Sequence, residues 1–170
     1  MSGPSPARAP VSFSVRAAGP EDAPAIHRVH EASILGLGIA AYALAEVVSW
    51  IGVLTDEGYV AAMAGGEAFW VTETEGAGVV GFSGQLGDEV KAVYIAPGYE
   101  RRGIGTRLLS LAEDAVRAQG HARVRIGASL TGQPFYEAHG YRIVERKLRT
   151  TRGGLEIPAL DMIRDLPPDC

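Results

Sequence analysis

Two glycines and two arginines stand between a predicted strand and a predicted helix, in the segment from residue 99 to residue 109. Gly103 and Gly105 lie where the first N–H groups of a helix have no intrahelical partner and the helix dipole is positive. Because glycine has no Cβ, a large anion can approach these N–H groups closely. Arg101 and Arg102 add positive charge at the same place. The segment therefore predicts a phosphate-binding loop, and a pyrophosphate is a natural ligand for it.

Two known phosphate-binding motifs do not fit this segment. The dinucleotide fingerprint G-x-G-x-x-G requires a third glycine where Leu108 stands, and the chain has no Gly-Lys-Ser/Thr of a Walker loop. The missing third glycine disfavours a nucleotide-binding regulator. Another interpretation stays open at this point, in which the glycines only allow tight packing at the start of a helix.

A second segment, ASLTGQPFYEAHGY at residues 128–141, follows the helix after this loop. Together the two segments resemble the GNAT superfamily of acyl-CoA-dependent N-acetyltransferases, in element order over roughly Val11 to Arg164. The first resembles the family's pyrophosphate loop, Gln/Arg-x-x-Gly-x-Gly/Ala, and the second its S-x-N-A…FYE-x-x-GF segment. Three positions depart from the family pattern: Glu100 replaces Gln or Arg, Thr131 replaces Asn, and Tyr141 replaces Phe.

The resemblance implies acetyl-CoA as co-substrate and no metal. In this family the strand before the loop carries a bulge and splays from the next parallel strand, and the pantetheine arm lies between the two. A main-chain N–H near Val93 or Tyr94 would then polarise the thioester carbonyl. The cofactor-binding residues implied in this way are Val93, Tyr94, Ile95, Arg101, Arg102, Gly103, Ile104, Gly105, Thr106, Ser129, Phe135 and Tyr136.

Two residues match catalytic positions of the family. Tyr136 matches a tyrosine acid, and a phenol with a pKa of about 10 is a suitable proton donor to a departing thiolate. The alternative for Tyr136 is an aromatic side chain that packs a short helix on the sheet. Glu89 stands eleven positions before Glu100, as does the glutamate base of the histone-acetylating branch. The alternative for Glu89 is the solvated start of a strand.

The histidines are weaker candidates for a functional role than Tyr136 and Glu89. His27 and His30 share one helix face at a spacing that can support a metal site, but no third ligand is at hand, so packing or a substrate-facing wall is expected. His139 is expected at a helix end and His121 in an exposed turn.

The aromatic side chains at positions 42, 50 and 59 have two interpretations. Tyr42, Trp50 and Tyr59 are expected in early helices, where similar proteins shape the acceptor pocket. They either form core or enclose an amine by cation–π contact.

Composition bounds the class of protein. The chain has 170 residues, a net charge of −4 and an apolar content of 46%, which suits one globular domain and disfavours nucleic acid as a partner. Cys170 is the one cysteine, so an intrachain disulfide and a Cys-rich zinc site are excluded. With no signal peptide and no segment apolar enough for a membrane, we expect a soluble, cytoplasmic protein without a membrane partner.

The hydrophobic pattern predicts an α/β (α+β) fold, with a mixed, mostly antiparallel sheet and flanking helices. We expect a flexible tail over 1–10, one domain over 11–165 and a second tail over 166–170. The helix after Asp22 is expected to end near Leu35, because Gly36 and Gly38 interrupt it. Strands are predicted at 11–17, 68–73, 79–86, 89–95, 124–128, 141–150 and 156–164, and helices at 23–35, 42–54, 56–64, 104–119 and 133–139.

One connection fixes the centre of the predicted sheet. The step from strand 89–95 through a helix to strand 124–128 is a βαβ crossover, so these two strands are expected to be parallel and adjacent. The resemblance places the cofactor in their splay.

The function implied is transfer of an acetyl group from acetyl-CoA to an amine by direct attack in a ternary complex. The acceptor is a small-molecule amine or a peptide or protein amine, and an acidic chain is compatible with a cationic one. A homodimer is one option for assembly. The alternative function is a non-catalytic GNAT-like domain that binds acyl-CoA as a sensor or interaction module.

Overall fold

The computed structural model describes residues 12–38, 41–52, 54–151 and 153–168. The tail predicted over residues 1–10, the predicted strand residue Val11 and the terminal Cys170 lie outside these ranges. The described elements in chain order are β1 (Phe13–Ala17), a 3-10 helix (Pro20–Asp22), α1 (Ala23–Gly38), α2 (Leu44–Ile51), α3 (Asp56–Ala64), β2 (Ala68–Thr74), β3 (Gly78–Leu86), β4 (Glu89–Ile95), α4 (Ile104–Ala118), β5 (Arg123–Ser129), α5 (Gln133–Ala138), β6 (Arg142–Thr150) and β7 (Glu156–Asp165).

The strands form one sheet in the order β1-β2-β3-β4-β5-β7-β6. Neighbouring strands are antiparallel except β4 and β5, which are parallel. The predicted fold class and the predicted crossover are therefore confirmed. The closing hairpin is also present, but its second strand, β7, pairs with β5 and leaves β6 at the edge.

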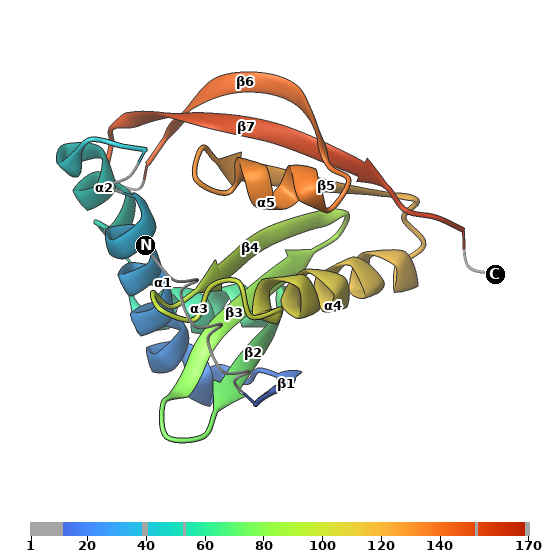
Figure 1. The fold of residues 1–170 in the computed structure, drawn as a ribbon, viewed down its shortest axis with the longest axis horizontal. Helices are drawn as coiled ribbons and strands as arrows, with labels where there is room; N and C mark the ends of the chain where they lie inside the picture. Colours follow the sequence, from blue (N-terminus) through green and yellow to red (C-terminus); the bar gives the residue numbers. More distant parts are fainter. Residues whose placement is uncertain (1–11, 39–40, 53, 152, 169–170) are drawn as a thin grey trace, which may run out of the picture.

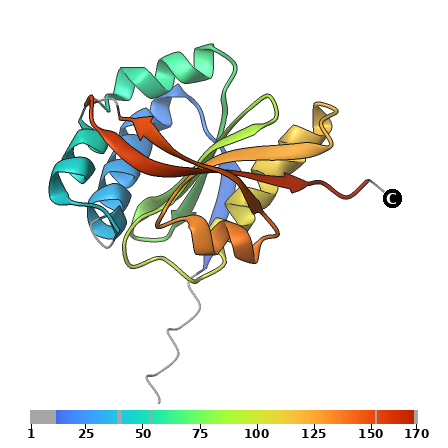
Figure 2. The same cartoon turned by 90° about the horizontal axis from the view of Figure 1, so that it is seen from above.

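Helices cover both faces of this sheet (Figures 1 and 2). Helices α1, α2 and α3 lie on one face, where the α1 residues Ala23, Ile26 and Val29 pack against Phe69 and Phe82 of β2 and β3. Helices α4 and α5 lie on the other face. The apolar sides of α1 and α4 are buried against the sheet, and this burial is the main source of their stability.

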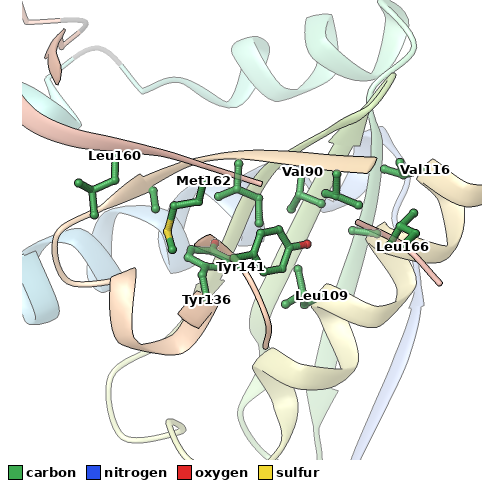
Figure 3. Close-up of a cluster of buried hydrophobic side chains, with 12 residues drawn as sticks. Val90, Leu109, Val116, Tyr136, Tyr141, Leu160, Met162 and Leu166 are labelled. Carbon is green, nitrogen blue, oxygen red and sulfur yellow. The ribbon is translucent and has the colours of Figure 1, made fainter. Parts of the chain in front are cut away.

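The face under α4 and α5 holds the core cluster of Figure 3. Leu109, Ala112 and Val116 recur at steps of three and four along α4 and pack on Val124 and Met162 of the central strands. After the helix, Gly120 has a φ of +88°, a conformation that favours glycine and suits a helix stop. The periodicity of this helix predicts its buried side correctly.

Helix α1 continues through the glycines that are predicted to break it. A Cβ at Gly36 would lie 2.6 Å from Cγ of Pro97, which follows Ala96 at the end of β4. Glycine therefore allows the helix to pass close to the end of β4, and this tertiary contact outweighs its low helix propensity, which costs about 1 kcal/mol. The predicted break at Gly36 is wrong for this reason.

Leu166, the first residue of the predicted C-terminal tail, packs with the domain. Its side chain is buried in the cluster under α4, and its N–H donates to the Ala122 carbonyl over 2.8 Å. Leu166 thereby extends the packing of the chain by one residue beyond β7.

Candidate active site

Strands β4 and β5 separate toward their carboxyl ends. They pair over the first residues of β4, Glu89 and Val90, and the next residue, Lys91, is the extra residue of a bulge against β3. From there to Ile95, β4 has no partner on β5, both strands being described in full. The bulge and the splay that the resemblance implies are both present.

A cavity of about 600 Å³ extends through this separation, and its walls come from both faces of the sheet. The middle of the wall includes Val93 of β4, Ser129 of β5 and Tyr136 of α5. We call one end the loop end; it is lined by Tyr99, Glu100, Arg101, Gly103, Gly105 and Thr106. We call the other the α1–α2 end; it is lined by Ser33, Ile34, Trp50 and Tyr94.

The backbone at the loop end turns sharply before α4. Arg101 has a φ of +59° and Gly103 a φ of +82°. Arg101 is the one non-glycine residue with a positive φ among those that the structure describes, and such conformations concentrate at ligand-binding loops. Where left-handed residues alternate with right-handed ones, successive N–H groups point to the same side of the backbone. Such a turn forms a concavity that can bind an anion.

The start of α4 adds further donors to this concavity. Gly103 is the N-cap residue and offers no side-chain acceptor, and the first intrahelical bond of the turn runs from the Arg107 N–H to the Gly103 carbonyl over 3.1 Å. The N–H groups before Arg107 therefore have no partner within the helix, and the dipole makes this end positive. The arrangement is suited to a phosphate or pyrophosphate group.

The two glycines of the motif have different roles. At Gly103 no heavy atom lies within 4 Å of the position that a Cβ would take, so glycine is needed there for its positive φ. At Gly105 a Cβ would lie 3.1 Å from the Phe135 ring, so glycine is needed there for close packing of α4 against α5. The packing interpretation therefore holds at Gly105, whereas Gly103 allows the backbone to turn before α4.

Glu100 turns its carboxylate toward the loop itself. The Gly98 N–H donates to Oε2 of Glu100 over 2.9 Å, and the Arg102 guanidinium donates to the Gly98 carbonyl over 3.1 Å. Both side chains thereby hold the turn between β4 and α4. Arg102 also lies over the Tyr99 ring, 5.4 Å from its centroid, and does not line the cavity.

His139 lies in the cavity wall, a place that its position at a helix end does not predict. Its Nδ1 is 2.7 Å from the Phe135 carbonyl and must donate to it, so in the neutral ring Nε2 is an acceptor. The Thr106 hydroxyl is 3.0 Å from Nε2 and donates to it. His139 therefore orients Thr106 at the loop end.

Tyr136 is buried against the core and also lines the cavity. The residue is 7% exposed, and burial raises the pKa of the phenol well above its ordinary value, to which the nearby Tyr94 phenol adds. A phenol is already protonated at neutral pH, and the raised pKa leaves Tyr136 in this form, which a proton donor requires.

Tyr94 occupies the opposite side of the same strand separation. Burial raises its pKa to about 12, and its ring packs on Phe82 and on His30, with the His30 centroid 4.3 Å away. Tyr94 thus connects the cavity to the core under α1.

The structure does not bring every predicted site residue to the cavity. Glu89 is four residues before Val93 on β4 and pairs with Lys91 at 3.6 Å and with Arg125 at 3.9 Å. It does not line the cavity, and neither does the Ile104 side chain, which is 1% exposed in the core. Ile104 can contribute only its main chain to the loop end.

The early aromatic residues divide between core and cavity. The Tyr42 hydroxyl donates to the Pro158 carbonyl over 2.9 Å and accepts from the Leu130 N–H over 2.8 Å, so Tyr42 is a structural residue just before α2. Tyr59 is buried in the α1 core. Trp50 alone of the three lines the cavity, at the α1–α2 end.

The two histidines of α1 have protein partners. Nδ1 of His27 is 2.7 Å from Asp56, and Nδ1 of His30 is 2.8 Å from the Tyr59 hydroxyl. In the part of the chain that the structure describes, no group of three or more His, Cys, Asp or Glu side chains could hold a metal ion. Among the described helices, none combines the length and apolarity needed to cross a bilayer.

Sequence reasoning misses the part of the α1–α2 end that α1 contributes. Ser33 and Ile34 fall in a helix whose spacing predicts only a core face, and nothing in that spacing points to a cavity. Trp50 becomes a candidate for the acceptor wall only through the resemblance.

Comparisons with known proteins agree with this fold. The model of the acetyltransferase (GNAT) domain matches residues 39–162. A GCN5-related N-acetyltransferase of Rhodopseudomonas palustris is similar in structure, with 26% identity, a TM-score of 0.84 and coverage of 92% of this chain and 98% of that one. A search of curated proteins finds no match.

Two further solved structures share the fold and hold coenzyme. PaiA N-acetyltransferase of Thermoplasma acidophilum, in complex with coenzyme A, has 20% identity, a TM-score of 0.71 and coverage of 91% of this chain and 99% of that one. YncA of Salmonella typhimurium, with acetyl-CoA, has 19% identity, a TM-score of 0.68 and coverage of 94% and 96%. Because the family model matches well over half of the sequence, this chain belongs to the GNAT acetyltransferase family.

Proposed function

We propose that the protein transfers an acetyl group from acetyl-CoA to an amine. The observation that carries this proposal is the continuous cavity, which joins an anion-binding loop end to the buried phenol of Tyr136 through the separation of β4 and β5. A ligand with a pyrophosphate at one end and a reactive group on a long arm fits such a shape. The coenzymes held by PaiA and YncA support this choice.

Each part of the wall has a role in the proposal. Main-chain N–H groups from Arg101 to Thr106 hold the pyrophosphate, with the Arg101 side chain adding charge. The edge of β4 at Val93 to Ile95 offers unpaired main-chain groups to the pantetheine arm, and an N–H near Val93 polarises the thioester carbonyl. Ser129 and Phe135 close the wall beside them.

The reaction balances without a redox partner. The lone pair of a neutral amine attacks the thioester carbonyl carbon, a C–N bond forms, and the C–S bond breaks. The amine loses one proton, and the departing CoA thiolate gains one, so amide and free thiol are the products. We assign Tyr136 as the acid that protonates the thiolate.

Glu89 is the predicted base for the amine proton. Its ion pairs with Lys91 and Arg125 place it at the start of β4, away from the cavity wall. Its role in removing the proton stays a prediction, and it would act through water rather than by direct contact with the acceptor.

Binding of acetyl-CoA tests the proposal first. A ligand that binds only the folded state stabilises it by about 2.7 kcal/mol at one hundred times its Kd, which raises the melting temperature by about 5 to 10 °C for a chain of this size. Acetyl-pantetheine, which lacks the pyrophosphate, is the matched control and should give a much smaller shift. No shift and no displacement signal at saturating acetyl-CoA would refute the proposal.

Release of free CoA in the presence of amines tests catalysis. Binding of acetyl-CoA without thiol release in a broad panel of small amines, peptides and protein lysines would favour the non-catalytic sensor instead.

A further inference from the structure

Arg149 reaches from the edge strand β6 across β7 to the surface of β5. A Cβ built on Gly127 of β5 would lie 2.7 Å from Cζ of Arg149, so the guanidinium rests directly on this glycine. Any other residue at position 127 would occupy the same space. The absence of a side chain at Gly127 therefore determines where the charge of Arg149 lies.

The register of the sheet places this guanidinium on the face of α1 and α2. Arg149 lies opposite Ile157 in the β6–β7 pair, and directly opposed residues share a face. Ile157 packs with Ile34, Tyr42 and Val47 under these helices. Arg149 is thus on the same side of the sheet as the α1–α2 end of the cavity.

The guanidinium of Arg149 lies beside the cavity wall, because Gly127 is two residues before Ser129 on the same face of β5, and Ser129 lines the cavity. Ile157, opposite Arg149, packs with Ile34, which also lines the cavity.

The charge of Arg149 lowers the pKa of Tyr94 and of Tyr42, against the larger raising effect of burial in each case. Tyr94 lines the α1–α2 end. A positive charge therefore stands beside the part of the cavity through which an acceptor would approach the thioester.

This charge is only weakly paired within the protein. Its nearest carboxylate oxygen is Oδ1 of Asp161 at 3.9 Å, whereas Lys147 holds the other oxygen of Asp161 at 2.7 Å. Over residues 12–38, 41–52, 54–151 and 153–168, the guanidinium makes no hydrogen bond to another side chain or main-chain group. The Arg149 side chain is 47% exposed, so its donors are accessible to a ligand.

We propose that Arg149, seated on Gly127, binds a carboxylate of the acceptor, so that the acceptor is an amine that also carries a carboxylate group. The inference rests on the proposed function and specifies its substrate class. The planar guanidinium offers parallel donors that match the two oxygens of a carboxylate. The amine can then enter the strand separation near Tyr94 while the carboxylate stays beside the cavity.

Matched acceptor pairs test this inference. Each pair is an amino acid and the amine that lacks its carboxylate: L-leucine with isopentylamine, L-phenylalanine with 2-phenylethylamine, and β-alanine with ethylamine. We expect kcat/KM, followed by free CoA release, to favour the carboxylate member of at least one pair by about 10-fold or more. In the Arg149→Gln variant, kcat/KM for the carboxylate member should fall about 10- to 100-fold, and kcat/KM for the plain amine should not change.

Further variants separate binding from a structural role. Arg149→Lys keeps the charge but not the planar donors, and should recover only part of the preference. Gly127→Ala should displace the guanidinium and lower the preference without removing the charge. Arg146→Gln is the matched control and should leave the preference unchanged, because Arg146 is an exposed arginine of the same strand that lies opposite Leu160, on the other face of the sheet.

The outcomes distinguish this inference from the proposed function. Equal kcat/KM for both members of every pair overturns the inference and leaves the proposed function intact, and so does an Arg149→Gln variant that loses activity equally on both members. Acetyl-CoA binding without turnover of any pair also overturns it. Failure of the proposed function is read separately, as the absence of a melting-temperature shift with acetyl-CoA or as the absence of CoA release with every amine of the broad panel. If circular dichroism shows that Arg149→Gln does not fold, Arg149→Lys and Gly127→Ala take its place as the test. An unchanged preference for the carboxylate member in both variants would then overturn the inference.

Discussion

The two ends of the cavity are built in different ways. The loop end comes from one continuous segment, residues 99–106, and presents mainly main-chain N–H groups. The α1–α2 end brings together side chains from separate elements, among them Ile34 of α1, Trp50 of α2 and Tyr94 of β4. A ligand at the loop end would meet main-chain groups that nearly every residue possesses, whereas a ligand at the α1–α2 end would meet side chains.

This difference separates what each end can recognise. Main-chain donors at a helix start recognise an anion, and glycines at set positions are enough to expose them. Side chains from distant elements can be exchanged one at a time without loss of the loop. We therefore expect variants at the loop end to change acetyl-CoA affinity and variants at the α1–α2 end to change acceptor kinetics alone.

The largest effect is expected at Gly103. In Gly103→Glu, a residue with a Cβ must adopt a φ of +82° and a negative charge enters the anion site, so acetyl-CoA affinity should fall at least about 100-fold. Isothermal titration calorimetry measures the Kd of acetyl-CoA. Gly76→Glu is the matched control, because Gly76 has a φ of +85° and equal clearance in a distant hairpin. An equal loss of binding in both variants would show that the effect is one of folding.

Tyr136 stands between the two ends and should affect turnover. In Tyr136→Phe, kcat should fall about 100-fold while the Kd of acetyl-CoA changes little, because the hydroxyl acts on the leaving thiolate. Single-turnover kinetics measures the chemical step. A loss of affinity as large as the loss of kcat would instead indicate that Tyr136 only packs α5 on the sheet.

Tyr141 is the natural control for Tyr136, since their rings are 5.7 Å apart in one cluster. The Tyr141 hydroxyl donates to the buried Glu113 over 2.7 Å, and Arg164 pairs with the same carboxylate. Tyr141→Phe should lower the free energy of unfolding by about 1 to 3 kcal/mol in urea titrations and leave kcat unchanged.

Trp50 tests the α1–α2 end. In Trp50→Leu, lost apolar contact should raise the KM of the acceptor about 5- to 10-fold, with no change in the Kd of acetyl-CoA. Steady-state kinetics at saturating acetyl-CoA measures the first quantity. Val48→Ala on the exposed side of the same helix is the control. A change in acetyl-CoA affinity in Trp50→Leu would contradict the expectation that variants at the α1–α2 end affect only the acceptor.

The smallest effect is expected at Gly105. A methyl group in Gly105→Ala would lie 3.1 Å from the Phe135 ring, which must move by a few tenths of an ångström, so acetyl-CoA affinity should fall only about threefold. Phe135→Leu in the same chain should relieve the contact, and a double-mutant cycle measures the coupling. Independent effects of the two substitutions would contradict the packing role of Gly105.

Much of the fold could be predicted because it depends on local patterns. The boundaries of α3 and β4 match the predicted ranges, since each has a strong start or stop signal such as the N-cap Thr55. The turn before α4 could be predicted as well, because the left-handed conformation of Gly103 is a property of its own backbone, whereas the contact of Gly105 with Phe135 could not.

The surroundings of Glu89 could not be predicted in this way. Its spacing from Glu100 matches that of a base, but its pairing with Lys91 and Arg125 depends on strand register.

The amino-acid pattern was enough to predict the order of the elements, the parallel pair β4 and β5, and the glycine-containing turn before α4, because these follow from periodicity, chain connectivity and backbone conformation. Three-dimensional packing was needed to establish that α1 passes Gly36, that β7 lies between β5 and β6, and that His139, Trp50 and Arg149 lie at or beside the cavity. Those outcomes depend on contacts between residues far apart in the chain, and such contacts exist only once the whole sheet has packed against its helices.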